Sequence, residues 1–359
     1  MMRIQSGLIT GTAPILLAGG LAVACLGRGR REEVVFPPGG MTLDSTGSQA
    51  RVYSTDSLRL AVQVGGTTDE DTTLIDPYMM ASDEGGVYLY EAENRVLRFD
   101  TAGTRRWLQG KSGGGPGEYR NPRDMAIGPD HRLWLVDPQS GRVTVLDPDQ
   151  GRVRAMITMR VPYSASITPL RSGFALYPSD LARDIFYFNE RGDTVRSDLI
   201  PWGGFRELEY LSRGLRTAVD PATGRWVLGF IYGNGWFAFD TAGRGSSRRY
   251  YVEPTRFPPV VKEYYPDGGV GTKLVRTAGS ALDIDLRGDT VFVLFDGQEP
   301  DRRRKLDLYS WQTGNYLGSI RLPEPADRIG LCGRYLAVFS TRPIPKLAFY
   351  VRERKPEVK

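Results

Sequence analysis

The chain has 359 residues, of which 40% are hydrophobic and 25% are charged, so it is long enough to bury a sizeable core and is not disordered by composition. Its 43 glycines and 24 prolines predict a globular protein with many turns. The net charge of +5 is too small an excess to indicate a nucleic acid as partner. Because His131 is the only histidine, metal centres that need several imidazoles are disfavoured.

The N-terminus predicts an export signal over residues 1–24. Arg3 precedes an apolar run, residues 8–23, that is too short and too interrupted by Gly, Thr and Pro to span a membrane as a helix. The run leads into GGLAVAC, which resembles a bacterial lipoprotein signal, in which the cysteine is acylated after cleavage. The resemblance implies a lipid on Cys25 and a location in the periplasm or at the outer membrane, the latter favoured because Leu26 and not Asp follows. A cleaved signal without lipid and an uncleaved anchor are the alternatives.

Residues 25–55 are polar and are expected to form a flexible tether between the lipid and a folded domain. The folded domain is expected over residues 56–352, with a polar tail over residues 353–359. Cys25 and Cys332 are the two cysteines of the chain. If the first carries a lipid, no intramolecular disulfide can form, and Cys332 is then expected to be a small buried apolar residue.

From residue 87 onward the chain repeats one pattern six times. Each copy has a short apolar strand, such as VYLY or LWLV, then a polar loop, then a second strand that ends in an aromatic residue or leucine. These end residues recur at intervals of 41 to 51 residues, with one longer interval of 70, and they are Phe99, Leu146, Phe188, Phe239, Tyr309 and Tyr350. In the first five copies a glycine follows four or five residues later, which predicts a hairpin turn and a further strand.

Another short strand precedes each copy, so each unit has four strands. Six such units predict an all-β fold, a six-bladed β-propeller with four antiparallel strands per blade. An all-β sandwich does not explain the repeat. The outer strand of the fourth unit is expected in RYYVEP, residues 249–254. The sixth unit lacks an outer strand, whereas LRLAVQVGG, residues 58–66, has no unit of its own, so we expect this N-terminal strand to close the ring.

The stretch QGKSGGGPGEY, residues 109–119, contains Gly-Lys-Ser but is not expected to bind phosphate. A phosphate loop needs glycine where Arg105 stands, and no helix can begin in the glycines that follow. Its place between two units instead predicts a crossing back to the central axis. With the residues up to Asp147 it resembles an NHL repeat, since GPGEY, Pro122, LWLVD and RVTVLD match that family's pattern in register. The resemblance covers residues 56–352 and implies an exported bacterial six-bladed propeller of that type.

Residues that begin inner strands, or that lie between the second and third strands of a blade, are expected to surround the channel mouth. The candidate binding face drawn from them, with two tyrosines of the long aromatic insertion after blade 4, is Asp76, Tyr78, Glu91, Asn121, Arg123, Asp137, Arg183, Arg216, Asp327, Arg328, Tyr264 and Tyr265. Acidic and basic groups are mixed among them, whereas a divalent-cation site would concentrate carboxylates, so no metal is expected. His131 is expected in a solvated turn at the opposite end, and no catalytic residue is assigned.

The cationic run RRRK, residues 302–305, is interpreted as a solvated loop balanced by nearby acids, with contact to an anionic partner as the alternative. The predicted function is a ligand-binding, protein-binding or scaffolding module at the cell envelope. A protein, saccharide or peptide ligand is expected, with no nucleic acid, no cofactor, and membrane contact through the N-terminal lipid alone. The competing function is a metal-dependent, calcium-type hydrolase or lactonase with its site in the channel.

Overall fold

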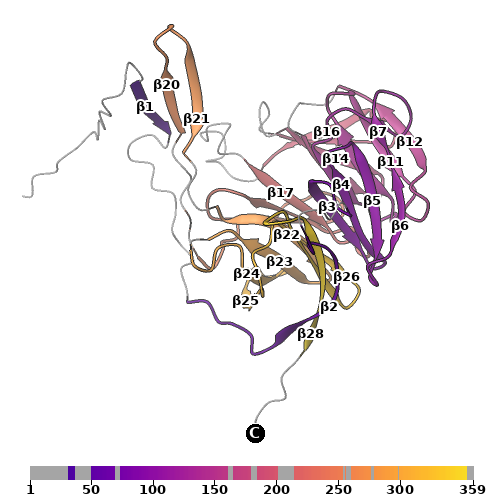
Figure 1. Ribbon diagram of the computed structural model, residues 1–359. Helices are drawn as coiled ribbons and strands as arrows, with labels where there is room; N and C mark the ends of the chain where they lie inside the picture. Colours follow the sequence, from indigo (N-terminus) through magenta and orange to yellow (C-terminus); the bar gives the residue numbers. More distant parts are fainter. Residues whose placement is uncertain are drawn as a thin grey trace, which may run out of the picture.

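The structure, a computed structural model, describes residues 31–36, 50–68, 73–160, 165–178, 184–200, 214–253, 255, 260–275, 279–297 and 299–353. Within these ranges the chain forms strands and turns without a helix, so no helix that could cross a membrane is found there. Six of the sheets are the blades of a ring around a central channel, which confirms the predicted six-bladed β-propeller (Figure 1).

Each blade begins at the channel and runs outward through antiparallel neighbours. Blade 1 contains β3 (Pro77–Asp83), β4 (Gly86–Glu91), β5 (Arg95–Asp100) and β6 (Arg105–Gln109). Blade 2 contains β9 (Asp124–Ile127), β10 (Leu133–Asp137), β11 (Arg142–Leu146) and β12 (Val153–Thr158). Blade 3 contains β13 (Ala165–Leu170), β14 (Gly173–Pro178), β15 (Asp184–Phe188) and β16 (Thr194–Leu199). Blade 5 contains β22 (Ala281–Arg287), β23 (Thr290–Phe295), β24 (Lys305–Ser310) and β25 (Tyr316–Arg321).

Blade 4 differs from the expected four continuous strands. It contains β17 (Leu215–Val219), β18 (Trp226–Phe230) and β19 (Trp236–Phe239), and its fourth place is held by two isolated bridges, from Trp236 to Arg249 and from Phe239 to Gly245. Residues 250–253 do not form the expected outer strand. Tyr251 is instead fully buried and packs its ring 6.3 Å from that of Tyr309 in blade 5.

The hydrophobic core lies between blades. In the described chain each of the six blade interfaces has its own cluster of buried side chains, for example Tyr88 and Leu133 between blades 1 and 2. The middle strand β4 is buried at every position because a neighbouring blade covers each face, whereas the outer strand β16 is mostly exposed. Cys332 lies in the cluster between blades 6 and 1 and is fully buried, as predicted.

Blade 6 closes the ring with strands from both ends of the chain. It contains β26 (Arg328–Cys332), β27 (Tyr335–Ser340), β28 (Lys346–Glu353) and, as its outermost strand, β2 (Ser57–Gly65). The pairing of β2 with β28 runs from Ser57 opposite Glu353 to Gly65 opposite Lys346. Val64 of β2 is buried against blade 1. The predicted closure by the N-terminal strand is therefore confirmed.

Two smaller sheets were not predicted. β20 (Val260–Tyr264) and β21 (Val270–Leu274) form a hairpin in the insertion after blade 4, and β1 (Arg31–Phe36) pairs with β20. This sheet projects away from the blades (Figure 1). β7 (Lys111–Ser112) and β8 (Glu118–Tyr119) form a short parallel pair inside the glycine-rich crossing.

The end of the expected tether also contacts the ring, on blade 5. Residues 52–54 lie alongside β25, where the N–H of Ser54 donates to the carbonyl of Ser319 (2.8 Å) and the N–H of Ser319 donates to the carbonyl of Val52 (2.9 Å). The chain thus adds to the edge of blade 5 before it enters blade 6 as β2. Two segments of residues 25–55, β1 and the residues on β25, are paired with the folded domain.

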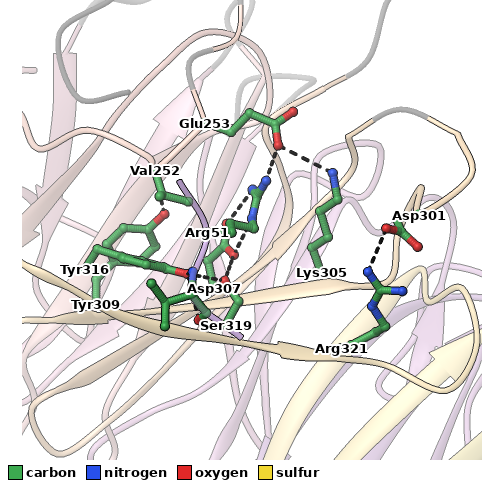
Figure 2. A network of polar contacts seen from close by, with 11 residues as sticks. Arg51, Val252, Glu253, Asp301, Lys305, Asp307, Tyr309, Tyr316, Ser319 and Arg321 are labelled. Atoms are coloured by element: carbon green, nitrogen blue, oxygen red, sulfur yellow. Dashed lines mark hydrogen bonds and ion pairs between the residues drawn. The ribbon is translucent and has the colours of Figure 1, made fainter. Parts of the chain in front are cut away.

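Arg51 fixes this segment through a buried ion pair (Figure 2). Its Nε and Nη2 atoms donate to the two carboxylate oxygens of Asp307 at 2.9 and 2.8 Å, and Nη1 donates to Glu253. The Asp307 side chain is fully buried and also accepts a hydrogen bond of 2.5 Å from the hydroxyl of Ser319. The guanidinium lies 4.5 Å from the centre of the Phe295 ring. The N-terminal segment therefore contributes the arginine of a buried ion pair on blade 5.

Replacing Arg51 by Met should lower the free energy of unfolding by about 3–5 kcal/mol, because the carboxylate of Asp307 stays buried without its counter-charge. Urea unfolding followed by circular dichroism measures this change. The matched control is Arg59→Met, which removes an exposed pair with Glu353 and should cost less than about 1 kcal/mol. Equal, small effects of the two substitutions would contradict a stabilising role of the buried ion pair between Arg51 and Asp307.

Candidate ligand site in the central channel

The starts of the six inner strands meet at one end of the channel, because every blade runs outward in the same order before the chain crosses back. A cavity of about 90 Å³ lies among them and is lined by residues of all six inner strands, β3, β9, β13, β17, β22 and β26. A space of this size holds several water molecules or one small ligand. The channel therefore contains a defined cavity near the mouth that the sequence analysis singled out.

Charged side chains of both signs line this cavity. Asp124 begins β9, Arg216 is the second residue of β17, Asp283 is the third of β22, and Arg328 begins β26. Asp285, further along β22, and Arg123, directly before β9, are the other two charged residues on the lining. The mixture of charge that the sequence analysis expected at the mouth is thus concentrated on a single cavity.

The two carboxylates hold neighbouring inner strands together. Asp124 accepts hydrogen bonds of 3.0 Å from the backbone N–H groups of Ile167 in β13 and of Met125. Asp283 accepts one of 2.9 Å from the N–H of Ile329 in β26. Because these oxygens satisfy backbone donors of the adjacent blade, the carboxylates serve the ring itself.

The two arginines also cross between blades, through backbone carbonyls. Arg216 donates from Nε to the carbonyl of Leu282 in β22 at 3.0 Å. Arg328 donates from Nη2 to the carbonyl of Tyr78 in β3 at 3.1 Å and from Nη1 to the carbonyl of Asp327 at 2.9 Å. Each guanidinium is therefore held in place by a neutral acceptor and not by a carboxylate.

Burial shifts the titration of these groups toward their neutral forms. It raises the pKa of Asp124 to about 6 and raises the pKa of Asp283 above its ordinary value. Together with the positive charge of Arg328, burial lowers the pKa of Arg216 to about 10. Arg216 remains a cation at neutral pH, but one that is poorly solvated.

Two more of the predicted residues lie outside the cavity, at the same end of the channel. Tyr78 is 40% exposed, and the edge of its ring meets Tyr90 at 5.3 Å between centroids. Burial of the rest of that side chain raises the pKa of its hydroxyl. Asp76, the residue before β3, is exposed. With Arg123, Arg216 and Arg328 they form the part of the predicted face that the fold does bring together.

Glu91 and Asp137 were predicted on this face but are fully buried. Each ends the second strand of its blade and points to the segment that leads into the inner strand, where Glu91 accepts from the N–H of Ile75 and Asp137 from the N–H of Arg120, both at 2.8 Å. Asp296 does the same in blade 5. These carboxylates hold the crossing segments against the blades by hydrogen bonds, so they have a structural role and are not available to a ligand.

The other predicted residues are dispersed. Asn121 is half-buried and uses its N–H on Asp137. Asp327 accepts from the N–H and hydroxyl of Thr341. Tyr264 and Tyr265 lie on the β20–β21 hairpin, where the Tyr265 hydroxyl donates to Glu263 at 2.8 Å. Arg183 lies outside the described residues.

The cationic run at residues 302–305 is largely balanced by acids, as the simpler interpretation predicts. Arg302 and Arg303 both pair with Asp296, and Lys305 pairs with Glu253. A groove between blades 5 and 6 runs past this loop. Among the described residues, the guanidinium groups of Arg304 and Arg342 on this groove have no hydrogen-bond or ion-pair partner.

The glycine-rich stretch crosses from blade 1 to blade 2, as predicted, and its charged side chains contact groups of the same stretch. The Glu118 carboxylate accepts from the N–H of Gly115 at 2.8 Å and pairs with Lys111. Arg142 reaches over from β11 and donates to the carbonyl of Gly114 at 2.8 Å. The lysine that suggested a phosphate loop therefore neutralises a carboxylate of the same loop.

His131 lies in the exposed turn between β9 and β10, at the predicted place. No group of three or more His, Cys, Asp or Glu side chains that could hold a metal ion occurs in the described part of the chain. Sequence reasoning missed Asp283 because it considered residues that begin inner strands or lie between the second and third strands, whereas Asp283 is the third residue of β22. The signal was present, since a carboxylate at every second position of an inner strand must face the channel or a neighbouring blade.

Comparison with solved structures places the chain among β-propellers. RRP9 WD40 repeats superpose with a TM-score of 0.51 at 10% identity, over 83% of this chain and all of that one. Virginiamycin B lyase from Staphylococcus aureus gives a TM-score of 0.48 at 12% identity, over 82% of this chain and 99% of that one. No family model and no curated protein matches the sequence. At these identities the likeness shows the fold alone.

Replacing Asp124 by Asn should change how stability depends on pH. Because the pKa of Asp124 in the folded chain, about 6, lies above the ordinary value of 3.8, its ionisation destabilises the fold as the pH rises. Relative to the variant, the wild-type chain should lose on the order of 2 kcal/mol of unfolding free energy between about pH 4 and about pH 7.

Urea unfolding at a series of pH values measures this difference. The matched control is Asp198→Asn on the exposed outer strand β16, which should not alter the profile in this range. Parallel pH profiles of unfolding free energy for the wild-type chain and the Asp124→Asn variant would show that the pKa of this carboxyl is not raised.

Proposed function

We propose that this chain is an exported, lipid-anchored propeller of the NHL-related type that binds a protein partner at the cell envelope. A β-propeller scaffold is typical of protein-binding modules. The proposal for export and for the lipid rests on the sequence of residues 1–25, which lie outside the described residues. The proposal for a partner surface rests on the groove between blades 5 and 6.

Two cations without a partner in the described chain are the observation that carries the partner surface. Arg304 and Arg342 line the groove, and Arg342 is exposed. The other cations of the groove are occupied, since Arg303 pairs with Asp327 and Lys346 with Glu324. Surplus positive charge beside satisfied pairs favours an acidic segment of a partner over an apolar one.

The groove belongs to the end of the ring where the inner strands begin. It is formed by the loop between β23 and β24, the loop between β27 and β28, and the segment that leads into β26. Each of these is a connection between strands of a closed ring, so the scaffold fixes their relative positions. A partner would therefore meet a preformed surface, which lowers the entropic cost of binding.

The test is crosslinking of the full-length chain in intact envelopes, with the captured proteins quantified by mass spectrometry. Arg342→Glu should reduce capture of the partner at least about tenfold, because it places like charge opposite an acidic segment. Arg334→Glu is the matched control, since it makes the same charge change on the same blade in the exposed turn between β26 and β27. Identical capture by the two variants would contradict the assignment of this groove.

Anchoring is tested separately by metabolic labelling with a clickable fatty acid. The wild-type chain and Cys332→Ala should carry the label, because Cys332 is buried and cannot be the acylated residue. Cys25→Ala should carry none and should leave the membrane fraction. Label that persists in Cys25→Ala would refute lipidation at this residue.

A further inference from the structure

The guanidinium of Arg216 is on the lining of the channel cavity, and its two terminal nitrogens make no short hydrogen bond in the described chain. The Nε atom of Arg216 is committed to the carbonyl of Leu282, and its Nη1 atom has only a long contact of 3.5 Å with the carbonyl of Leu215. No partner of Nη2 is found in the described chain. The side chain is thus anchored through Nε, and it belongs to the lining of the cavity.

Nearby carboxylates do not fill this edge. None of the three aspartates on the cavity, Asp124, Asp283 and Asp285, forms an ion pair with Arg216 among the described residues, and Asp285 pairs with Arg287 instead. Asp124 and Asp283 lie close enough to Arg216 to act in the direction of a higher pKa for its guanidinium. Their oxygens are directed to backbone N–H groups of the neighbouring blades. Arg216 is half-buried, and a half-buried charge without a direct counter-ion loses part of its hydration, which an anion from outside would offset.

A second arginine strengthens the case for an anion. Arg328 lines the same cavity, and its positive charge acts on Arg216 from across the channel. The hydrogen bonds of its guanidinium within the described chain go to neutral carbonyls, those of Asp327 and Tyr78. Two guanidinium groups that face one cavity and repel one another are drawn together by a negative ligand between them.

The rest of the lining defines the size and character of that ligand. Met79, Met125 and Leu215 supply apolar walls, and the hydroxyl-bearing Ser166 lies on the same cavity. A volume of about 90 Å³ admits on the order of four to six non-hydrogen atoms. A carboxylate fits the paired terminal nitrogens of an arginine in a bidentate fashion, and a short carbon chain fits methionine and leucine.

We propose that the channel binds a small aliphatic carboxylate through the terminal nitrogens of Arg216, with Arg328 providing the second positive charge. This site is separate from the groove between blades 5 and 6. It makes the propeller a receptor for a small metabolite, in addition to any protein that it binds.

The test uses acetate and butyrate as probes on the full-length wild-type protein, with chloride and inorganic phosphate at matched ionic strength. Saturation-transfer NMR should detect the methyl protons of the bound carboxylates, and both should raise the melting temperature in a saturable way, butyrate more than acetate. Chloride should not reproduce the shift. A shift that follows ionic strength alone, or that phosphate produces more strongly than either carboxylate, would overturn the proposal.

Variants of Arg216 identify the residue. Arg216→Met should weaken carboxylate binding at least about tenfold, and Arg216→Lys, which keeps the charge but not the planar pair of donors, should weaken it as well. If Arg216→Met does not fold, Arg216→Lys and the NMR competition between butyrate and chloride still decide the question. Undiminished binding in Arg216→Lys and Arg216→Met would refute the site.

Arg342→Glu serves as the control, because it alters the groove and leaves the channel untouched. It should bind butyrate as the wild-type chain does. Loss of butyrate binding in this variant would contradict a separate channel site, whereas loss of partner capture alone leaves the channel site intact.

Discussion

The pairing of β2 with β28 is the interaction on which the rest of the structure depends. A propeller has no central core, and each blade is stabilised by the two blades beside it. Without β2, the sixth blade would expose the edge of β28 and would lose the contact that Val64 makes in the cluster with blade 1. The strand joins the two ends of the chain in one sheet, and Arg51, placed just before it, secures the approach across blade 5 with a buried ion pair.

Closure also creates the channel site. Asp124, Arg216, Asp283 and Arg328 come from four different blades and are separated by tens of residues in the chain, yet they line one cavity because the ring brings the starts of the inner strands together. The same side chains tie adjacent inner strands through backbone groups, so the site is rigid in the sense that each charged group is fixed by a neighbouring blade. A preorganised cation of this kind favours recognition of a small anion without a large rearrangement.

The sequence was informative where a local pattern has one structural solution. The repeat of four strands predicted the six blades, the strand at residues 58–66 without a unit predicted the closure, and the glycines of residues 113–117 ruled out a phosphate loop. It was less informative about side-chain roles. Glu91 and Asp137 were chosen for their position between strands, but a carboxylate there also satisfies the amides of the incoming chain, and sequence alone does not separate the two roles. Arg51 could not be found at all, because its partner Asp307 is more than 250 residues away and the surrounding segment has no periodicity.

The central claim is that the N-terminal strand closes the ring, and truncation tests it most directly. A chain that begins at Ala50 keeps Arg51 and β2, whereas one that begins at Leu74 lacks both. Thermal unfolding followed by circular dichroism should give the first chain one cooperative transition near that of the longer protein. The second should melt far lower or fail to fold, since several apolar side chains worth about 1.5–3 kcal/mol each lose their burial. Equal melting temperatures for the two chains would contradict the closure and, with it, the account of the channel site.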